Sequence, residues 1–125
     1  MQIVRARDTR AIETPNGNSG VGLATPDRGA HEVSVVRQRQ TPGGFNPVHT
    51  HDRDEVMVLL AGAVTVAAGD TRAVLGPGDA AIVPAGTPHR VDNAGDTDAE
   101  WLIVSAAGVR FYREDGEEAH PDWSR

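Results

Sequence analysis

Three histidines and one glutamate form the group of residues in this sequence that is best suited to chemistry. His49, His51 and Glu55 lie in one short segment, and His89 lies in a second. Imidazole suits Fe, Ni, Cu and Zn, and carboxylate oxygen also suits Mn and adds the negative charge that a divalent ion favours. We therefore predict a site for one divalent transition-metal ion (Fe, Mn, Ni, Zn or Cu) with these four side chains as ligands.

The spacing within the first segment favours a common direction for its ligands. Side chains alternate between the two faces of a strand, so His49 and His51 point the same way. Glu55 shares their parity if the backbone stays extended between it and His51. Met57 and Leu59 have the same parity and would line the same interior. The residues between them are also apolar, which predicts a strand that is buried on both faces.

A metal ion held by these four ligands would have an open side. On an octahedral ion, four protein ligands leave two positions for water, substrate or dioxygen, which is typical of a catalytic site rather than a closed structural one. A dication beside a single carboxylate keeps a net positive charge, and this charge favours an anionic or enolate-forming substrate.

The elements that must position these ligands are expected to be short strands. Fourteen Gly and eight Pro fall between short apolar runs, which predicts many turns. The expected strands are residues 2–5, 22–24, 32–39, 55–60, 64–67, 71–75, 80–83, 89–93, 100–105 and 109–113. Residues 64–75 are typical of a β-hairpin. Many short strands at even spacing predict an all-β sandwich or barrel.

The length of 125 residues suits one domain with one core. We expect an irregular N-terminal segment with short strands in residues 1–29, the barrel in residues 30–113 and an acidic tail in residues 114–125. Residues 14–22 are rich in Pro, Asn, Ser and Gly and are predicted to be a loop. The tail is expected to be solvated, except that Trp123 docks on the body of the protein.

The composition excludes several classes of mechanism. The sequence has no cysteine, so it has no disulfides, thiolate metal sites or cysteine nucleophiles. All 12 basic residues are Arg, which excludes lysine-based catalysis. The net charge of −6 disfavours nucleic-acid binding. No apolar run approaches the length of a membrane span or follows Met1 as a signal sequence would, so we expect no membrane partner and a cytoplasmic location.

Other candidate pocket residues carry weaker signals. On the strand that precedes the first segment, Gln38 or Arg37 can face inward and bind a polar or anionic group. His31 and His120 lie outside the metal pattern and are expected on the surface, and Tyr112 is far from the pattern in sequence. The apolar walls of a substrate pocket are predicted to be formed by Phe45, Met57, Val91 and Trp101.

The two segments resemble the paired motifs of the cupin superfamily. The first motif is Gly, five residues, His-x-His, three or four residues, Glu, six residues, Gly. The second is Gly, five residues, Pro-x-Gly, two residues, His, three residues, Asn. Every position is matched, by Gly43, His49, His51, Glu55 and Gly62 in the first motif and by Gly78, Pro84, Gly86, His89 and Asn93 in the second. The strand rhythm extends the similarity to about residues 30–107, as in small single-domain (cupin type-2) members.

The resemblance implies a jelly-roll β-barrel, also called a double-stranded β-helix, with a metal ion inside its mouth. It implies that His49, His51, Glu55 and His89 are the metal ligands. It also implies a homodimer, which in relatives often exchanges N-terminal strands. The superfamily includes dioxygenases, cyclases, isomerases, lyases and binding proteins, and the fold alone does not choose among them.

We expect a small metal-dependent enzyme that acts on a small-molecule substrate. Our first interpretation is a dioxygenase-type reaction, in which substrate and dioxygen take neighbouring positions on the metal ion. Glu55 would be the catalytic residue, acting as a ligand and a transient base as is proposed for some relatives. One alternative is a non-redox Lewis-acid cyclase, isomerase or lyase. The other is a non-catalytic module that binds or senses a small molecule through the metal.

Overall fold

Short strands account for nearly all of the regular structure in the computed structural model, which describes residues 1–125. The only helical segments are the 3-10 turns η1 (Ala6–Asp8), η2 (Pro26–Arg28) and η3 (Asp122–Ser124). None of them has the length and apolarity that a membrane-crossing helix needs.

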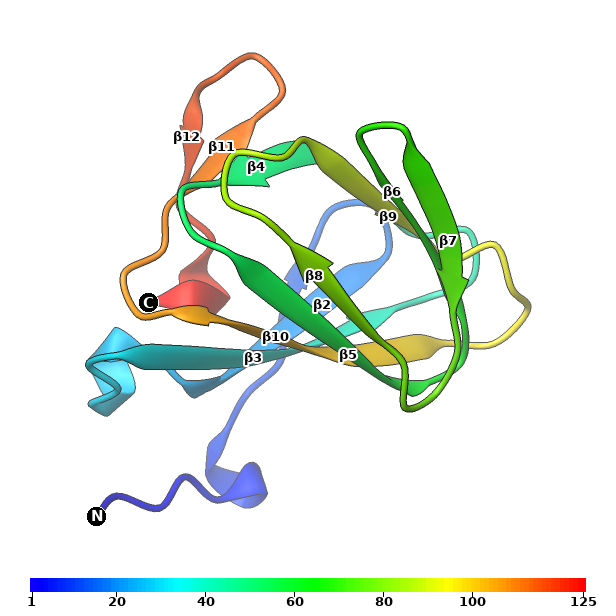
Figure 1. Cartoon of the computed structure of the whole chain (residues 1–125). Coiled ribbons are helices and arrows are strands. Elements are labelled where there is room, and N and C mark those ends of the chain that lie inside the picture. Colours follow the sequence, from blue (N-terminus) through cyan, green and yellow to red (C-terminus); the bar gives the residue numbers. More distant parts are fainter.

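The strands form two antiparallel sheets of six strands each, which face one another (Figure 1). The first sheet contains, in spatial order, β1 (Ile12–Thr14), β2 (Asn18–Ala24), β3 (Val33–Gln40), β10 (Ala99–Ala106), β5 (Glu55–Ala61) and β8 (Ala80–Val83). The second contains β12 (Glu118–Ala119), β11 (Phe111–Arg113), β4 (Phe45–His51), β9 (His89–Asp92), β6 (Val64–Ala68) and β7 (Thr71–Leu75). The all-β jelly-roll prediction is confirmed, and β6 and β7 form the predicted hairpin.

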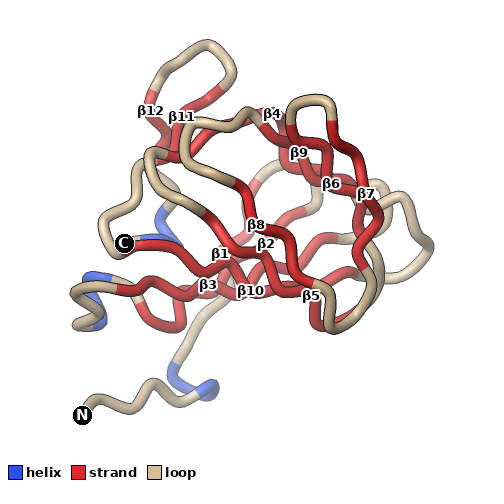
Figure 2. Tube along the Cα trace, in the orientation of Figure 1, coloured by secondary structure: helices blue, strands red, loops and turns tan.

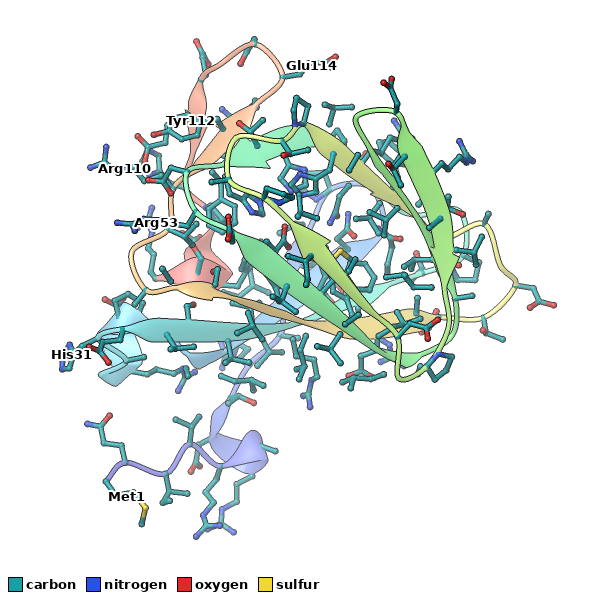
Figure 3. All side chains as sticks on the ribbon, viewed as in Figure 1. Met1, His31, Arg53, Arg110, Tyr112 and Glu114 are labelled. Carbon is teal, nitrogen blue, oxygen red and sulfur yellow. The ribbon has the colours of Figure 1, made fainter.

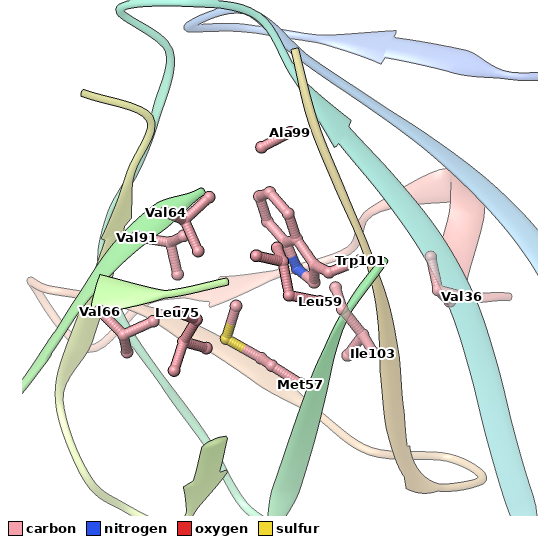
Figure 4. Packing of buried hydrophobic residues seen from close by; sticks show 10 residues of the cluster. All are labelled: Val36, Met57, Leu59, Val64, Val66, Leu75, Val91, Ala99, Trp101 and Ile103. Atoms are coloured by element: carbon pink, nitrogen blue, oxygen red, sulfur yellow. The ribbon is translucent and has the colours of Figure 1, made fainter. Parts of the chain in front are cut away.

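The core lies between the two sheets, where the inward residues of facing strands meet (Figure 4). Its largest fully buried side chains are Trp101, Met57 and Leu59. Burial of each such side chain contributes about 1.5–3 kcal/mol. The cluster consists of Val36, Met57, Leu59, Val64, Val66, Leu75, Val91, Ala99, Trp101 and Ile103.

The N-terminal part is more regular than the sequence predicts. β2 runs through most of the predicted loop 14–22 and pairs with β3 from Asn18↔Gln40 to Ala24↔Val35. Its turn-like composition is overridden by this backbone pairing. The predicted strand at residues 2–5 is absent, and the first residues extend away from both sheets (Figure 2).

The chain crosses from one sheet to the other between His51 and Glu55. β4 ends at His51 in the second sheet and β5 begins at Glu55 in the first, so the predicted extended backbone between them is wrong. The corner is held by Asp52, whose Oδ1 accepts a hydrogen bond from the backbone nitrogen of Arg110 at 2.7 Å. The side chains of His51 and Glu55 therefore meet because their two sheets face one another, and not because both residues lie on the same face of one strand.

The outer face of the first sheet is apolar and partly exposed along β5 and β8. Val56 and Val58 on β5 are half-buried, Leu60 is 45% exposed, and Ile82 on the neighbouring β8 is 73% exposed. The prediction that β5 is buried on both faces is therefore wrong for the single chain. The homodimer that the resemblance implies stays a prediction.

Candidate metal centre

The structure brings His49, His51, Glu55 and His89 together at one end of the space between the sheets. One potential ligand atom from each side chain lies within 4.8 Å of the others. His51, Glu55 and His89 are buried, and His49 is half-buried. The four residues come from β4, the start of β5 and the start of β9, so both sheets contribute.

Backbone pairing fixes the relative positions of the histidines. His49 on β4 is the register partner of His89 on β9, beyond an irregularity in the pairing that follows Asn46. The loop before His89 is tied to β4, because the backbone nitrogen of Gly86 donates to the carbonyl oxygen of His51 at 2.8 Å. Gly86 has φ of 75°, a left-handed conformation that favours glycine.

Backbone carbonyls set the tautomers of two of the imidazoles. Nδ1 of His49 lies 2.8 Å from the carbonyl oxygen of Pro47, and Nδ1 of His89 lies 2.9 Å from that of Thr87. A carbonyl oxygen only accepts, so in each ring Nδ1 carries the hydrogen. In the neutral rings Nε2 is then the ligand atom, held in the way that metal-binding histidines commonly are.

The contacts of Glu55 call for a cation. Its Oε2 lies 3.0 Å from Nε2 of His89 and 3.1 Å from Nδ1 of His51. If His89 is neutral, Nε2 and Oε2 are two acceptors in contact, and they repel unless a proton or a metal ion lies against them. Nε2 of His51 is buried and has no hydrogen-bond partner, which costs about 1–3 kcal/mol if nothing binds it. Three imidazoles and a carboxylate thus fit a divalent transition-metal ion.

The electrostatics of the cluster keep Glu55 ionised. Burial alone raises the pKa of Glu55, but the hydrogen bonds and charges of His51 and His89 outweigh it and lower the pKa to about 2. Burial also lowers the pKa of His89, and its hydrogen bond to the Glu55 carboxylate more than reverses this, so the pKa of His89 is raised overall.

His49 is kept neutral. Burial, with a further effect of the charge on His89, lowers its pKa to about 4. A neutral imidazole is the form that binds a metal ion. His49 therefore needs no deprotonation at neutral pH, whereas the raised pKa of His89 favours a protonated ring, from which a metal ion would displace the proton.

All four side chains line a cavity of about 770 Å³, within the range of small-molecule sites. Of the predicted apolar walls, Met57, Val91 and Trp101 line it and Phe45 does not. Phe45 lies on the opposite face of β4 from Asn46 although it has the parity of His49, because the irregularity between Asn46 and His49 breaks the alternation along the strand. The guanidinium of Arg90 lies 4.6 Å from the Phe45 ring.

The polar candidates divide between the cavity and the surface. Gln38 lines the cavity, whereas Arg37 points outward and pairs with Glu100 at 3.2 Å. His31 is exposed as predicted and lies at the edge of the molecule, close to the start of β3 (Figure 3). His120 is exposed as predicted, although it and Tyr112 also border the cavity.

The C-terminal tail forms a wall of the cavity that the sequence did not predict. Trp123 docks on the body of the protein as expected, with its ring 5.6 Å from that of Phe111, and Phe111 lies 4.7 Å from the ring of His51. Trp123 packs directly against Gly20 and Gly22 of β2. An added Cβ would lie 2.8 Å from the indole at Gly20 and 2.6 Å from the Trp123 carbonyl oxygen at Gly22. In the sequence, the only indication of this contact is the spacing of Gly20 and Gly22, which places both glycines on one face of β2.

Fold and site together define a jelly-roll protein with a buried cluster of three histidines and one carboxylate that opens into a cavity. The family model for the cupin domain matches residues 36–105. The chain therefore belongs to the cupin family, which confirms the resemblance inferred from the motifs.

The curated relatives are longer proteins. Germin-like protein 3-8 of Oryza sativa subsp. japonica is 33% identical over 99 residues, which cover 68% of this chain and 44% of that protein. Germin-like protein subfamily 1 member 7 of Arabidopsis thaliana is 43% identical over 86 residues, covering 62% and 36%. The chain spans less than half the length of these two relatives.

Solved structures share the fold. The polyketide cyclase RemF from Streptomyces resistomycificus superimposes with a TM-score of 0.77 at 23% identity, covering 87% of this chain and 81% of that one. Oxalate oxidase superimposes with a TM-score of 0.70 at 26% identity, covering 80% and 58%.

Proposed function

We propose that the protein is a metal-dependent enzyme in which His49, His51, Glu55 and His89 hold one divalent transition-metal ion beside a small organic substrate. The observation that carries this proposal is the contact between Glu55 Oε2 and His89 Nε2, a buried carboxylate and a buried imidazole 3.0 Å apart on the wall of a cavity. A structural metal site has no need of such an opening.

Oxygen-dependent oxidation is the reaction type that we favour. When bound, the metal ion would supply Lewis-acid and redox chemistry for the reaction of a chelating substrate with dioxygen. The similarity to oxalate oxidase, at 26% identity, supports an oxidation, although this chain covers only 58% of that protein.

Glu55 is the proposed catalytic residue and would accept a proton from a substrate hydroxyl group. Its pKa of about 2 makes the carboxylate a weak base while both histidine contacts persist. Proton transfer therefore requires that the contact to His51 or to His89 loosens as the substrate binds. The imidazoles of His49 and His89 keep their orientation during this step, because each is held at Nδ1 by a carbonyl oxygen.

The test begins with the metal content of protein purified without a chelating tag. Oxygen uptake is then measured with a panel of catechols, enols and thiols, for the wild-type protein and for His89→Ala. The exposed His31→Ala is the matched control. We expect bound metal and oxygen uptake to disappear only in His89→Ala.

The other outcomes identify the alternatives. Conversion of a substrate without oxygen uptake would indicate Lewis-acid chemistry. A metal-loaded protein that retains a ligand and converts nothing would indicate a binding module. Unchanged metal content in His89→Ala would refute the site itself.

A further inference from the structure

A network of side-chain amides lies beside the metal centre and plays no part in holding it. Asn18 on β2, Gln38 and Gln40 on β3 and Asn46 on β4 belong to it. Nε2 of Gln38 donates to Oδ1 of Asn18 at 3.0 Å and to Oδ1 of Asn46 at 2.9 Å. Nε2 of Gln40 donates to Oδ1 of Asn18 at 2.9 Å. The network thus joins the two sheets.

The backbone fixes which way each amide points. Nδ2 of Asn18 lies 2.8 Å from the carbonyl oxygen of Phe45 and 3.0 Å from that of Pro15. Carbonyl oxygens only accept, so this atom must be the nitrogen, and the other amide atom of Asn18 must be the oxygen. Gln38 must then present its nitrogen to Asn18, and the second hydrogen of that nitrogen goes to the oxygen of Asn46.

Three polar atoms of the network remain without a partner in the chain, and one of them, Oε1 of Gln40, is buried. Oε1 of Gln38 accepts no hydrogen bond, and Nδ2 of Asn46 donates none, because the only side-chain bonds of these amides are those through Gln38 Nε2. Gln38 is only 5% exposed, yet both residues line the cavity. The cavity wall therefore presents one fixed acceptor and one fixed donor, on either side of the hydrogen bond that joins the two amides.

The charges around this pair favour an uncharged ligand group. Arg113 is the only cationic Lys or Arg side chain that borders the cavity, and it is exposed. A carboxylate placed against the amide pair would face the oxygen of Gln38 with no buried cation to balance it, and burial of an unpaired charge is costly. A group that both donates and accepts, such as a carboxamide or a neighbouring hydroxyl and carbonyl, satisfies both atoms.

We propose that Gln38 and Asn46 form a subsite for an uncharged donor–acceptor group of the substrate, at the end opposite the group that reaches the metal centre. The inference rests on the proposed function, because the metal centre anchors the other end. Asn46 and His49 are three residues apart on β4, which corresponds to at most about 10 Å of strand, and the irregularity in the pairing between them lets both side chains face the cavity. The substrate class is therefore a neutral molecule of one or two rings with a chelating edge and a remote amide or hydroxy-carbonyl group.

The test compares two probes that differ only at the remote group, 3,4-dihydroxycinnamamide and 3,4-dihydroxycinnamate. Their binding to the Ni²⁺-loaded protein is measured by calorimetry without oxygen, with catechol as a reference that lacks the remote group. We expect the amide to bind at least tenfold more tightly than the acid. In Asn46→Ala this ratio should fall below threefold, while the affinity for catechol changes less than twofold.

Two further variants define the comparison. Asn46→Asp keeps an acceptor for Gln38, loses the donor and adds a negative charge, so it should also reduce the affinity for the amide if Asn46→Ala proves unstable. Tyr112→Phe removes a polar group elsewhere on the cavity border, the Tyr112 hydroxyl, and should leave the ratio of amide to acid affinity unchanged. Equal binding of amide and acid by the wild-type protein, or an unchanged ratio in both Asn46 variants, would overturn the subsite. The proposed function fails by a separate measurement, if His89→Ala binds catechol as tightly as the wild-type protein.

Discussion

Asp54 Oδ1 accepts a hydrogen bond from the backbone nitrogen of Ala85 at 2.9 Å, and this contact joins the two loops that carry the candidate metal ligands. Asp54 directly precedes Glu55, and Ala85 lies in the turn before His89. With the bond from Gly86 to the carbonyl oxygen of His51, it makes the two loops a single unit. The distance between Glu55 and His89 therefore depends on a residue that does not touch the metal centre.

Asp54→Ala should weaken metal binding without abolishing it. Loss of the bond frees the turn before His89, and loss of such an outer contact typically costs about tenfold or more in metal affinity. The measurement is a competition titration with a chromogenic chelator at neutral pH. Asp70→Ala, at the exposed turn between β6 and β7, is the matched control. Equal affinities of the two variants would show that Asp54 does not position the ligands.

The grouping of the four candidate ligands could be predicted from their spacing in the sequence, but the path of the chain between them could not. Alternation along an extended chain suggested one strand from His49 to Glu55. The structure instead turns at residues 52–54, and the hydrogen bond that holds this corner reaches Arg110. A contact over so long a separation leaves no periodic signal in the sequence.

The amide subsite was hidden for a related reason. Gln38 was a candidate, but nothing local distinguished it from Arg37, and its orientation depends on Asn18. Asn18 lies in a segment whose composition is typical of a loop, and only the pairing of β2 with β3 brings it to Gln38. Tertiary pairing here overrides local propensity.

Acid should release the metal ion. Protons compete for the imidazoles, and the raised pKa of His89 means that this ring is protonated before that of His49 as the pH falls. We expect metal binding near neutral pH to release protons, seen as a dependence of the calorimetric enthalpy on the ionisation enthalpy of the buffer. Retention of the metal ion at pH 4 would contradict an imidazole-rich site.

The metal-free protein should lose stability in acid through His49. Its pKa is 6.5 in the unfolded chain and about 4 in the folded one, so between these values the unfolded chain binds more protons. The stability is thus present above pH 6.5 and is lost as the pH falls toward 4, by at most roughly 3 kcal/mol. His89, with its raised pKa, acts in the opposite sense and stabilises the protein below pH 6.5.

Urea unfolding at several pH values separates these two effects. In His49→Ala the fall in unfolding free energy between pH 6.5 and pH 4 should become shallower, and in the exposed His31→Ala it should not change. Glu55 adds a further loss only below pH 4.5, because its pKa is lowered from 4.5 to about 2. If the unfolding free energy of His49→Ala and of the wild-type protein depended on pH in the same way, His49 would not be held neutral in the folded protein.

Gly20→Ala should displace the C-terminal wall of the cavity. The new Cβ would lie 2.8 Å from the Trp123 indole, so the ring must move, and overpacking of this kind costs about 1–3 kcal/mol. Because Trp123 packs on Phe111 and Phe111 on His51, the displacement should also loosen the metal centre. The readouts are a red shift of the Trp123 emission, assigned with Trp123→Phe, and faster proteolysis within residues 114–125. Gly76→Ala, where the nearest atom is 3.7 Å away, is the control. If Gly20→Ala matched this control in emission and proteolysis, the packing of Trp123 against Gly20 would have no role in holding the tail.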